Sequence, residues 1–116
     1  MNSKVYNKSK GEVGEEIAKN YLKSKGYKIV QVNFKNYIGE IDIIAYDKDI
    51  LVFVEVKYRK TSTFGLPREA VNYNKQNKIR TVATSYIKRY NLFAKICRFD
   101  VIEILHDEIT HIENAF

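Results

Sequence analysis

Apolar residues recur at helical spacing in two parts of the chain. Residues 11 to 25 place them three and four positions apart, and Gly26 follows, as is typical of a residue that ends a helix. The packing side of this first helix would hold Gly14, Ile17, Ala18, Tyr21 and Leu22. Pro67 suits the first turn of a second helix, which we expect to run to about residue 90. Its apolar stripe would hold Ile79, Val82, Ala83, Tyr86, Ile87 and Tyr90.

Four other segments have the residue types and lengths of strands. Residues 27 to 34 predict one strand, and residues 39 to 60 predict two, joined by a short polar turn. Residues 98 to 105 and 108 to 112 are expected to close the chain as shorter strands. The order of helix, three strands, helix and one or two strands predicts an α/β fold with a mixed central sheet flanked by helices.

Composition narrows the setting of this fold. With 116 residues, 45% of them hydrophobic, the chain is long enough for one core, so we expect a single domain over residues 1 to 116 with residues 1 to 10 flexible. The polar start and the lack of a long apolar run predict a cytoplasmic protein with no membrane contact. Cys97 has no partner for a disulfide. A net charge of +6 favours an acidic partner such as nucleic acid, although a solvated basic surface would give the same charge.

Charged residues interrupt the two most apolar strands, within residues 39 to 60. Because strand side chains alternate, one face would hold Glu40, Asp42, Ile44, Phe53, Glu55 and Lys57. The other face would hold Ile41, Ile43, Val52, Val54 and Val56. A tight hairpin at Lys48 and Asp49 puts Asp42 directly across from Glu55. Opposed carboxylates repel, and a site that tolerates them usually holds a cation, so a divalent metal is the natural candidate.

The same charges fit a simpler interpretation, in which a solvated outer face carries Glu and Lys cross-strand pairs. Ile44 and Phe53 lie on the polar face, which suggests that this face is covered, and covered charges need partners or a function. Two roles remain open for Glu40: it would join the outer shell of the metal, or it would pair with Lys57. Both interpretations of the face predict the same strands, so only the geometry separates them.

The arrangement of Asp42 in one strand and Glu55-Val56-Lys57 in the next resembles the PD-(D/E)xK nuclease superfamily. A closer resemblance rests on six strings in order: "GEVGEEIA", "GEIDIIA", "VFVEVKYR", "FGLPREAV", "KQNKI" and "RFDVIEI". Together they resemble the YraN family, also called UPF0102, which is similar in turn to archaeal Holliday-junction resolvases. The similarity covers about residues 11 to 105. It implies a restriction-endonuclease-like fold, while catalytic activity is a separate matter.

The resemblance implies roles for the strand residues. Asp42 and Glu55 match the metal-binding acids, with Ile41 in place of the proline that names the motif. Lys57 matches the lysine that positions or activates the attacking water. Two carboxylates suffice for a Mg²⁺ or Mn²⁺ ion that keeps several waters.

Two helical positions are added by the same resemblance. Glu15 matches an acid of resolvase-like members, and helical periodicity independently puts it near the sheet, whereas Glu16 should face water. Lys75 and Gln76 correspond to the helix-borne Lys/Gln position, and Gln76 can point at the sheet. The predicted catalytic set is therefore Asp42, Glu55, Lys57, Glu15 and Gln76, with Asp42, Glu55 and Glu15 as metal ligands.

Cations and aromatics surround this predicted site and can bind phosphates without reading sequence. The candidate nucleic-acid-binding residues are Lys57, Tyr58, Arg59, Lys60, Lys75 and Lys78. Taken one at a time, Lys78 also fits a solvated helix face, and Tyr58 also fits a cover over the sheet edge. Arg98 and Asp100 are expected to form a structural pair.

These observations predict a nucleic-acid-binding protein of nuclease fold, which acts as a metal-dependent endonuclease on branched or damaged DNA. One alternative is a nucleic-acid-binding module without turnover. Another is a protein-interaction adaptor whose basic face meets an acidic protein. Resemblance to resolvases makes a two-fold homodimer reasonable.

Overall fold

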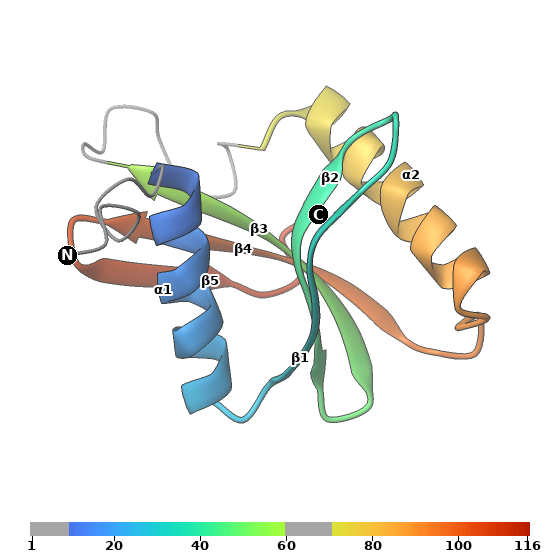
Figure 1. Cartoon of the computed structure of the whole chain (residues 1–116), viewed down its shortest axis with the longest axis horizontal. Coiled ribbons are helices and arrows are strands. Elements are labelled where there is room, and N and C mark those ends of the chain that lie inside the picture. The colour runs from blue at the N-terminus through green and yellow to red at the C-terminus, as the bar shows by residue number, and fades with distance from the viewer. Residues whose placement is uncertain (1–9, 60–70) are drawn as a thin grey trace, which may run out of the picture.

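The computed structural model describes residues 10–59 and 71–116, which form two helices and five strands (Figure 1). In chain order they are α1 (Lys10–Ser24), β1 (Lys28–Lys35), β2 (Glu40–Asp47), β3 (Ile50–Arg59), α2 (Tyr73–Arg89), β4 (Cys97–Leu105) and β5 (Glu108–Ile112). The predicted order of elements is confirmed. The expectation that residues 1 to 10 are flexible concerns a segment of which all but Lys10 lies outside the described residues.

The start of the second helix was predicted wrongly. α2 begins at Tyr73, not near Pro67, which lies outside the described residues. Asn72 is its N-cap: the backbone of Asn72 is extended, and its side-chain oxygen accepts a hydrogen bond of 2.9 Å from the Lys75 N–H. An Asn at this position satisfies a backbone donor that the first turn leaves unpaired, which fixes the helix start. The preference of proline for a first helical turn, on which the prediction rested, includes no side-chain acceptor of this kind.

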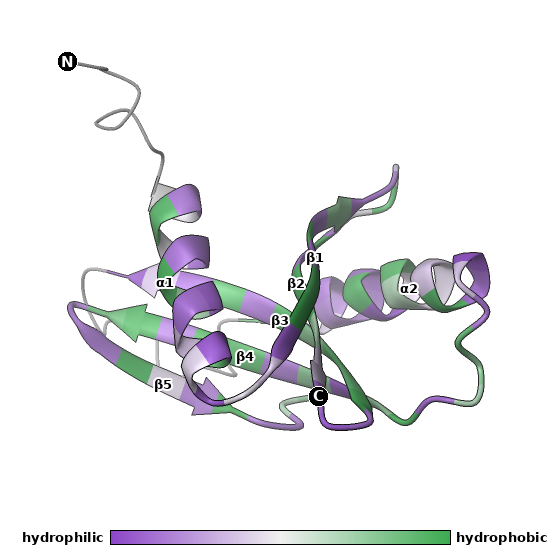
Figure 2. Cartoon of the chain, turned by 60° about the horizontal axis from the view of Figure 1, so that its bottom comes forward, coloured by the Kyte–Doolittle hydropathy of each residue, from purple (hydrophilic) through white to green (hydrophobic). Residues whose placement is uncertain are grey.

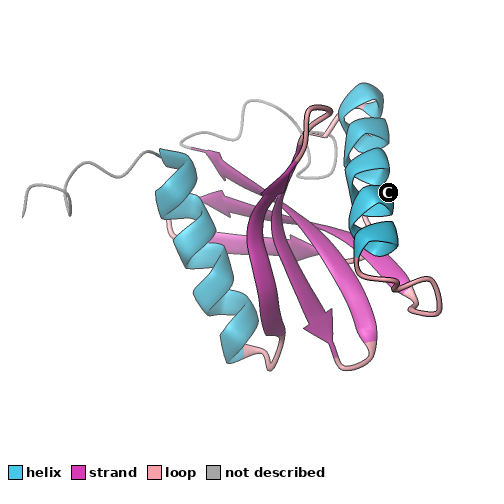
Figure 3. Ribbon diagram, turned by 45° about the vertical axis from the view of Figure 1, so that its right-hand side comes forward, coloured by secondary structure: helices cyan, strands magenta, loops and turns pink. Residues whose placement is uncertain are grey.

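The five strands form one sheet in the order β1-β2-β3-β4-β5. Only β3 and β4 run parallel, and α2 makes the crossover between them, while the other neighbours are antiparallel. The helices cover opposite faces (Figure 3). The α/β architecture with a mixed sheet flanked by helices is thus confirmed.

Each helix closes a separate core against its face of the sheet. The α2 core includes Phe34, Ile44, Phe53, Ile79, Val82 and Tyr86. The α1 core includes Ala18, Leu22, Ile43, Val52, Val54 and Ile102. The central strands are accordingly mainly apolar along their length (Figure 2). The sheet therefore buries both faces where the helices pack on it, and Glu55 in β3 does not lie on a solvated outer face.

The predicted register of the β2–β3 hairpin is correct from Asp47↔Ile50 to Ile43↔Val54. Beyond Ile43 the ladder with β3 ends, although β2 continues to pair with β1 as far as Glu40. Ile41 then packs in the α2 core and not beside Ile43, which corrects the predicted alternation. The reason is that the end of the β1–β2 hairpin twists away from β3, so its side chains no longer follow the faces of the main sheet.

A buried polar network holds the last strand in place. Asp100 is fully buried, accepts hydrogen bonds from Arg98 at 2.9 and 3.0 Å, and lies 2.7 Å from His111 Nε2. The expected Arg98–Asp100 pair is therefore present, and hydrogen bonds with Arg98, His111 and the Asn114 N–H lower the pKa of Asp100 despite its burial. We assign this network to stability.

Neither α1 nor α2, the two helices in the described part of the chain, is long and apolar enough to cross a membrane.

Candidate functional site: a carboxylate cluster where two strands separate

The candidate site lies where β2 and β3 part. At the point where the ladder ends, the N–H of Val56 has no strand carbonyl across from it, and Asp42 Oδ2 accepts its hydrogen bond at 2.8 Å. The Asp42 side chain thereby replaces a backbone acceptor and is held in one orientation. This explains how a carboxyl group can occupy the middle of the sheet.

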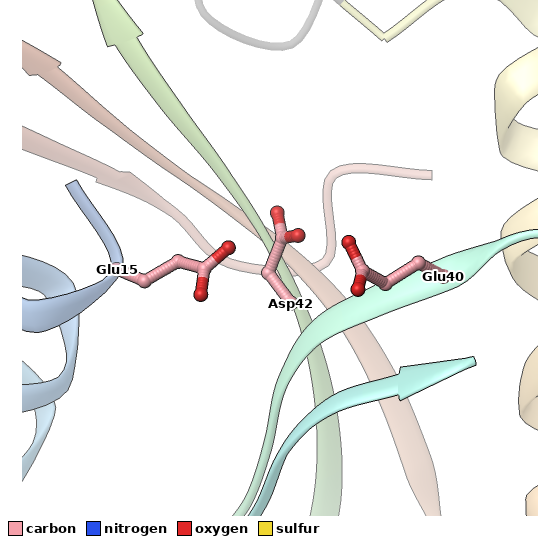
Figure 4. Close-up of side chains that lie close together, drawn as sticks. All are labelled: Glu15, Glu40 and Asp42. Carbon is pink, nitrogen blue, oxygen red and sulfur yellow. The ribbon is translucent and has the colours of Figure 1, made fainter. Parts of the chain in front are cut away.

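Three carboxylates converge at this point from two elements. Glu40 and Asp42 come from β2, and Glu15 comes from α1, with ligand oxygens that all lie within 4.8 Å of one another. Figure 4 shows the three side chains pointing toward a common centre. Glu15 also has a hydrogen-bond partner in Asn33, which adopts a left-handed backbone (φ 52°) within β1. The sequence reasoning did not find Asn33, since only the folded chain brings it next to α1.

Glu55 extends the cluster across β3. Its side chain is 4% exposed, and it is hydrogen-bonded to Asp42, so the predicted proximity of these two residues is present. Burial and the neighbouring Glu55 raise the pKa of Asp42 to about 9. Burial also favours the neutral form of Glu55, but its bonds with Asp42 and Lys75 outweigh burial and lower the pKa of Glu55. The opposite directions of these two pKa shifts favour a protonated Asp42 beside an ionised Glu55 in the metal-free site.

Two ammonium groups neutralise the remaining charge. Lys75 Nζ lies 2.5 Å from Glu55 Oε2, and Lys57 Nζ lies 3.8 Å from the same oxygen. Burial and the neighbouring Lys75 ammonium lower the pKa of Lys57, while the bond to Glu55 raises the pKa of Lys75 against the opposing effect of its burial. Among the ion pairs of the described residues, Lys57 pairs with Glu55 and not with Glu40. Glu40 instead joins Glu15 and Asp42, which settles its position.

A glycine sets the distance between α1 and β3. A Cβ atom built on Gly14 would lie 2.9 Å from Tyr58 Cβ, closer than two side chains can approach. Glycine therefore lets the helix rest on the strand, and Glu15 follows directly along the chain. Tyr58, a predicted nucleic-acid contact, thus packs against α1, and Glu16 is exposed as predicted.

Other predicted residues lie around the cluster or away from it. The amide of Gln76 donates to the Val71 carbonyl at 2.9 Å, a contact that supports the start of α2. Arg59 Nε lies 3.1 Å from the buried carboxylate of Glu103, which gives Arg59 a structural partner. Lys78 is exposed on α2, and Lys60 lies outside the described residues.

Residues 14–104 match the Uncharacterised protein family UPF0102. The chain belongs to this family. It is 52% identical over 112 residues to a UPF0102 protein of Clostridioides difficile, covering 95% of this chain and 98% of that protein. A UPF0102 protein of Caldanaerobacter subterraneus is 49% identical over 120 residues, covering 97% and 98% of the two chains. A third, from Alkaliphilus metalliredigens, is 46% identical over 112 residues, covering 94% and 98%.

The donor set of this UPF0102 protein fits a hard divalent cation. Mg²⁺ binds oxygen at about 2.0–2.1 Å, so two of its ligand oxygens lie at most about 4.2 Å apart. The oxygens of Glu15, Glu40 and Asp42 need to move by less than about 1 Å from their 4.8 Å limit to meet this requirement. Glu40 is exposed and can adjust, whereas Asp42 must release its proton before it can bind a cation.

The UPF0102 site can thus present oxygen ligands on one side and ammonium groups on the other. Glu55 connects the two, because it contacts both Asp42 and the lysines. The predicted ligands were Asp42, Glu55 and Glu15; the structure groups Glu15 and Asp42 with Glu40, and places Glu55 between Asp42 and Lys75. A cation on one side and two ammonium groups on the other is an arrangement suited to an anion with several oxygens.

Proposed function

We propose that this UPF0102 protein is a divalent-metal-dependent nuclease that acts on DNA, with branched or damaged DNA as its substrate class. The observation that carries the proposal is the convergence of Glu15, Glu40 and Asp42 within 4.8 Å, with Glu55 between Asp42 and two lysines. Hydrolysis of a phosphodiester requires a nucleophilic water and compensation for charge that develops on the phosphoryl oxygens. The site offers groups for both needs.

The acidic side chains would hold the cation. Glu15, Glu40 and Asp42 offer the oxygens, and Mg²⁺ or Mn²⁺, when bound, would polarise the phosphate and lower the pKa of a coordinated water. Asp42 is kept in position by the Val56 N–H and must give up its proton on binding. The Asp42 carboxyl would therefore reach the cation in a fixed orientation.

The lysines would act on the phosphate side. Lys57 and Lys75 both contact Glu55, so a scissile phosphate that enters competes with Glu55 for their ammonium groups. The lowered pKa of Lys57, caused first by burial, makes its proton easier to move than that of a solvated lysine. Lys57 would orient the water or the phosphate, and Lys75 would hold a phosphate oxygen.

We also propose a restriction-endonuclease-like fold and a two-fold dimer, as the resemblance implies, and a cytoplasmic location, as the composition of the chain predicts. What supports the fold is the sheet with a parallel β3–β4 pair and helices on both faces, with the acids at the parting of β2 and β3. A net charge of +6 supports an anionic partner. Binding without turnover is the second candidate, favoured by the burial of Asp42, which raises its pKa and opposes the loss of the proton that metal binding requires.

The experiment is a cleavage assay on linear, branched and nicked DNA and on RNA, with Mg²⁺, Mn²⁺ or chelator. We expect cleavage of at least one DNA with metal and none in chelator. Glu15→Gln, which removes a ligand charge from α1 without a change in the strands, should lower the metal-dependent cleavage, whereas Glu16→Gln at an exposed acid of the same helix is the matched control and should cleave like the parent. Absence of cleavage on every substrate, together with metal-independent binding, would sink the nuclease and leave the binding module. Binding that favours an acidic polypeptide over every nucleic acid would instead indicate the adaptor.

A further inference from the structure

One aromatic side chain at the β1–β2 turn has almost no contact with the rest of the protein. Tyr37 is 97% exposed, more than any other large apolar residue in the described part of the chain. The turn that carries it extends away from the main sheet and lies beside α2 (Figures 1 and 3). Both faces of the Tyr37 ring are therefore open to a ligand, and burial of the ring against that ligand would be favourable.

The turn itself is well ordered, in contrast to its tyrosine. Asn36 Oδ1 accepts hydrogen bonds from the Ile38 and Gly39 N–H groups at 2.8 and 3.3 Å, and Asn36 Nδ2 donates to Ser85 Oγ of α2 at 3.2 Å. A Cβ on Gly39 would lie 3.6 Å from Val82 Cγ2, so the backbone rests on the helix. Tyr37 is therefore presented on a rigid support, which lowers the entropy cost of a contact.

A groove runs between this turn and the second half of α2. It has a volume of about 340 Å³ and is lined by Asn36, Tyr37, Ile38, Thr81, Thr84, Ser85 and Lys88. Lys88 is the one charged side chain in that lining, and Lys78 lies next to Gly39 on the same helix. The hydroxyls of Thr81 and Thr84 donate to backbone carbonyls of α2, so the ammonium groups remain as the donors for an anion.

We propose that this surface binds single-stranded nucleic acid: a base stacks on the Tyr37 ring, and an adjacent phosphate contacts Lys88. An aromatic face beside a cation, without an acid in the lining, matches the two halves of a nucleotide. Stacking tolerates any base, so the contact would not select a sequence.

This surface deepens the proposed nuclease function and rests on it. β2 begins at Glu40, three positions after Tyr37, and α2 carries both Lys75 of the carboxylate cluster and Lys88 of the groove. A strand bound at the cluster can therefore continue along α2 to the turn. Such a strand must be unpaired there, because bases in a duplex do not expose a face for stacking. The expected substrates are therefore those with a single-stranded segment, such as flaps and branch points.

The test uses the absence of tryptophan from the chain. Tyr37→Trp places one indole at the turn, and Phe93→Trp, at an aromatic that is 66% exposed and outside the groove, is the matched control. Each variant is titrated with a short oligothymidylate, with duplex DNA and with polyglutamate, in chelator so that no cleavage occurs. We expect oligothymidylate to quench the fluorescence of Tyr37→Trp and to leave Phe93→Trp unchanged.

Affinity measurements separate stacking from charge. Tyr37→Ala should weaken oligothymidylate binding about tenfold with an unchanged salt slope, whereas Lys88→Ala should flatten the slope of log K against log salt by about 0.7. Tyr37→Phe should bind like the parent, because the ring remains.

Three results would overturn the inference. Full affinity in Tyr37→Ala would show that the ring is not used, and would leave the nuclease proposal untouched. A response of Tyr37→Trp to polyglutamate alone would identify a protein surface. Failure of the parent and of every variant to bind oligothymidylate would show that this surface does not bind a nucleotide. Conversely, Tyr37-dependent binding in a protein that cleaves nothing would support this surface and count against the nuclease.

Discussion

Lys75 Nζ lies 2.5 Å from Glu55 Oε2, whereas Lys57, two positions along the same strand as Glu55, lies 3.8 Å away. The nearer partner of the buried acid therefore comes from α2 and not from β3. Since α2 begins at Tyr73, Lys75 stands in its first turn, and the Lys75 N–H is also held by the N-cap Asn72. One residue therefore serves both features: the backbone N–H of Lys75 binds the N-cap that starts α2, and its ammonium group neutralises Glu55.

The first prediction concerns this ion pair. Lys75→Met should reduce the free energy of unfolding, because it leaves Glu55, which is 4% exposed, with the more distant Lys57 as its cation. The Lys75 side chain is 43% exposed, so solvent screens part of the interaction, and we expect a loss of about 1–2 kcal/mol. Urea unfolding in chelator measures it. The control is Lys78→Met on the exposed side of the same helix, with a change below about 0.5 kcal/mol. Equal effects of the two substitutions would contradict the assignment.

The second prediction separates catalysis from binding. Glu55→Gln keeps the size of the side chain but removes the charge that holds both lysines, so metal-dependent cleavage should be lost. DNA affinity in chelator should be equal or tighter, since the ammonium groups become available to phosphates. Glu16→Gln, at an exposed acid of α1, should change neither property.

Lys57→Ala completes this comparison. It should also lose cleavage, but its DNA affinity should not increase, because a cation has been removed. Electrophoretic mobility shifts and cleavage rates measured on the same DNA give both quantities. If cleavage survived in Glu55→Gln, the activity would belong to another site or to a contaminant.

The third prediction concerns pH and the metal-free protein. Burial raises the pKa of Asp42 from 3.8 to about 9 in the folded state. A carboxyl with a raised folded pKa contributes stability that is present below its unfolded pKa and is lost as pH rises toward the folded pKa. Asp42→Asn removes this titration and keeps an oxygen for the Val56 N–H. The variant should therefore be more stable than the parent near pH 7, by about 1–3 kcal/mol.

Unfolding free energies measured in chelator between about pH 5 and pH 8.5 test this, and the advantage of Asp42→Asn should grow with pH across that range. Asp49→Asn, at an exposed acid in the β2–β3 turn, is the matched control and should show no such trend. An Asp42→Asn protein that is less stable than the parent at each pH would show that the negative charge is stabilising.

The fourth prediction concerns the contact between α1 and β3. Gly14→Ala places a methyl group 2.9 Å from Tyr58 Cβ, and this backbone-near atom cannot swing aside. The helix must shift, which should cost about 1–3 kcal/mol of stability and move Glu15 away from Asp42. Mn²⁺ affinity, measured by calorimetry on the folded protein, should fall. Gly39→Ala, whose methyl group would meet ordinary contacts at 3.6 Å, should retain Mn²⁺ affinity. Unchanged Mn²⁺ affinity in Gly14→Ala would show that Glu15 is not a ligand of the proposed metal site.

Periodicity alone determined several features of this protein. Alternation along β2 and β3 correctly paired Ile44 with Phe53 on one face, because both strands are long and apolar and a shift by one residue would expose every core side chain. Helical spacing correctly turned Glu15 inward and Glu16 outward. These are local rules of backbone geometry, and they hold wherever the elements themselves form.

Tertiary structure decided what lies where elements meet. The predicted alternation of faces failed at Ile41, because β2 there leaves β3 and continues with β1 alone. Alternation also could not decide the role of Glu40, whose neighbour Glu15 comes from α1. Lys75 is the nearer partner of Glu55 because of where α2 lies. The N-cap at Asn72 fixes the start of α2, whereas the sequence pattern predicted an earlier start, near Pro67. Strand divergence and helix docking depend on contacts between residues far apart in the chain. The sequence by itself therefore determined which side chains face inward, and the packing of α1, α2 and the parted strands decided which of them meet.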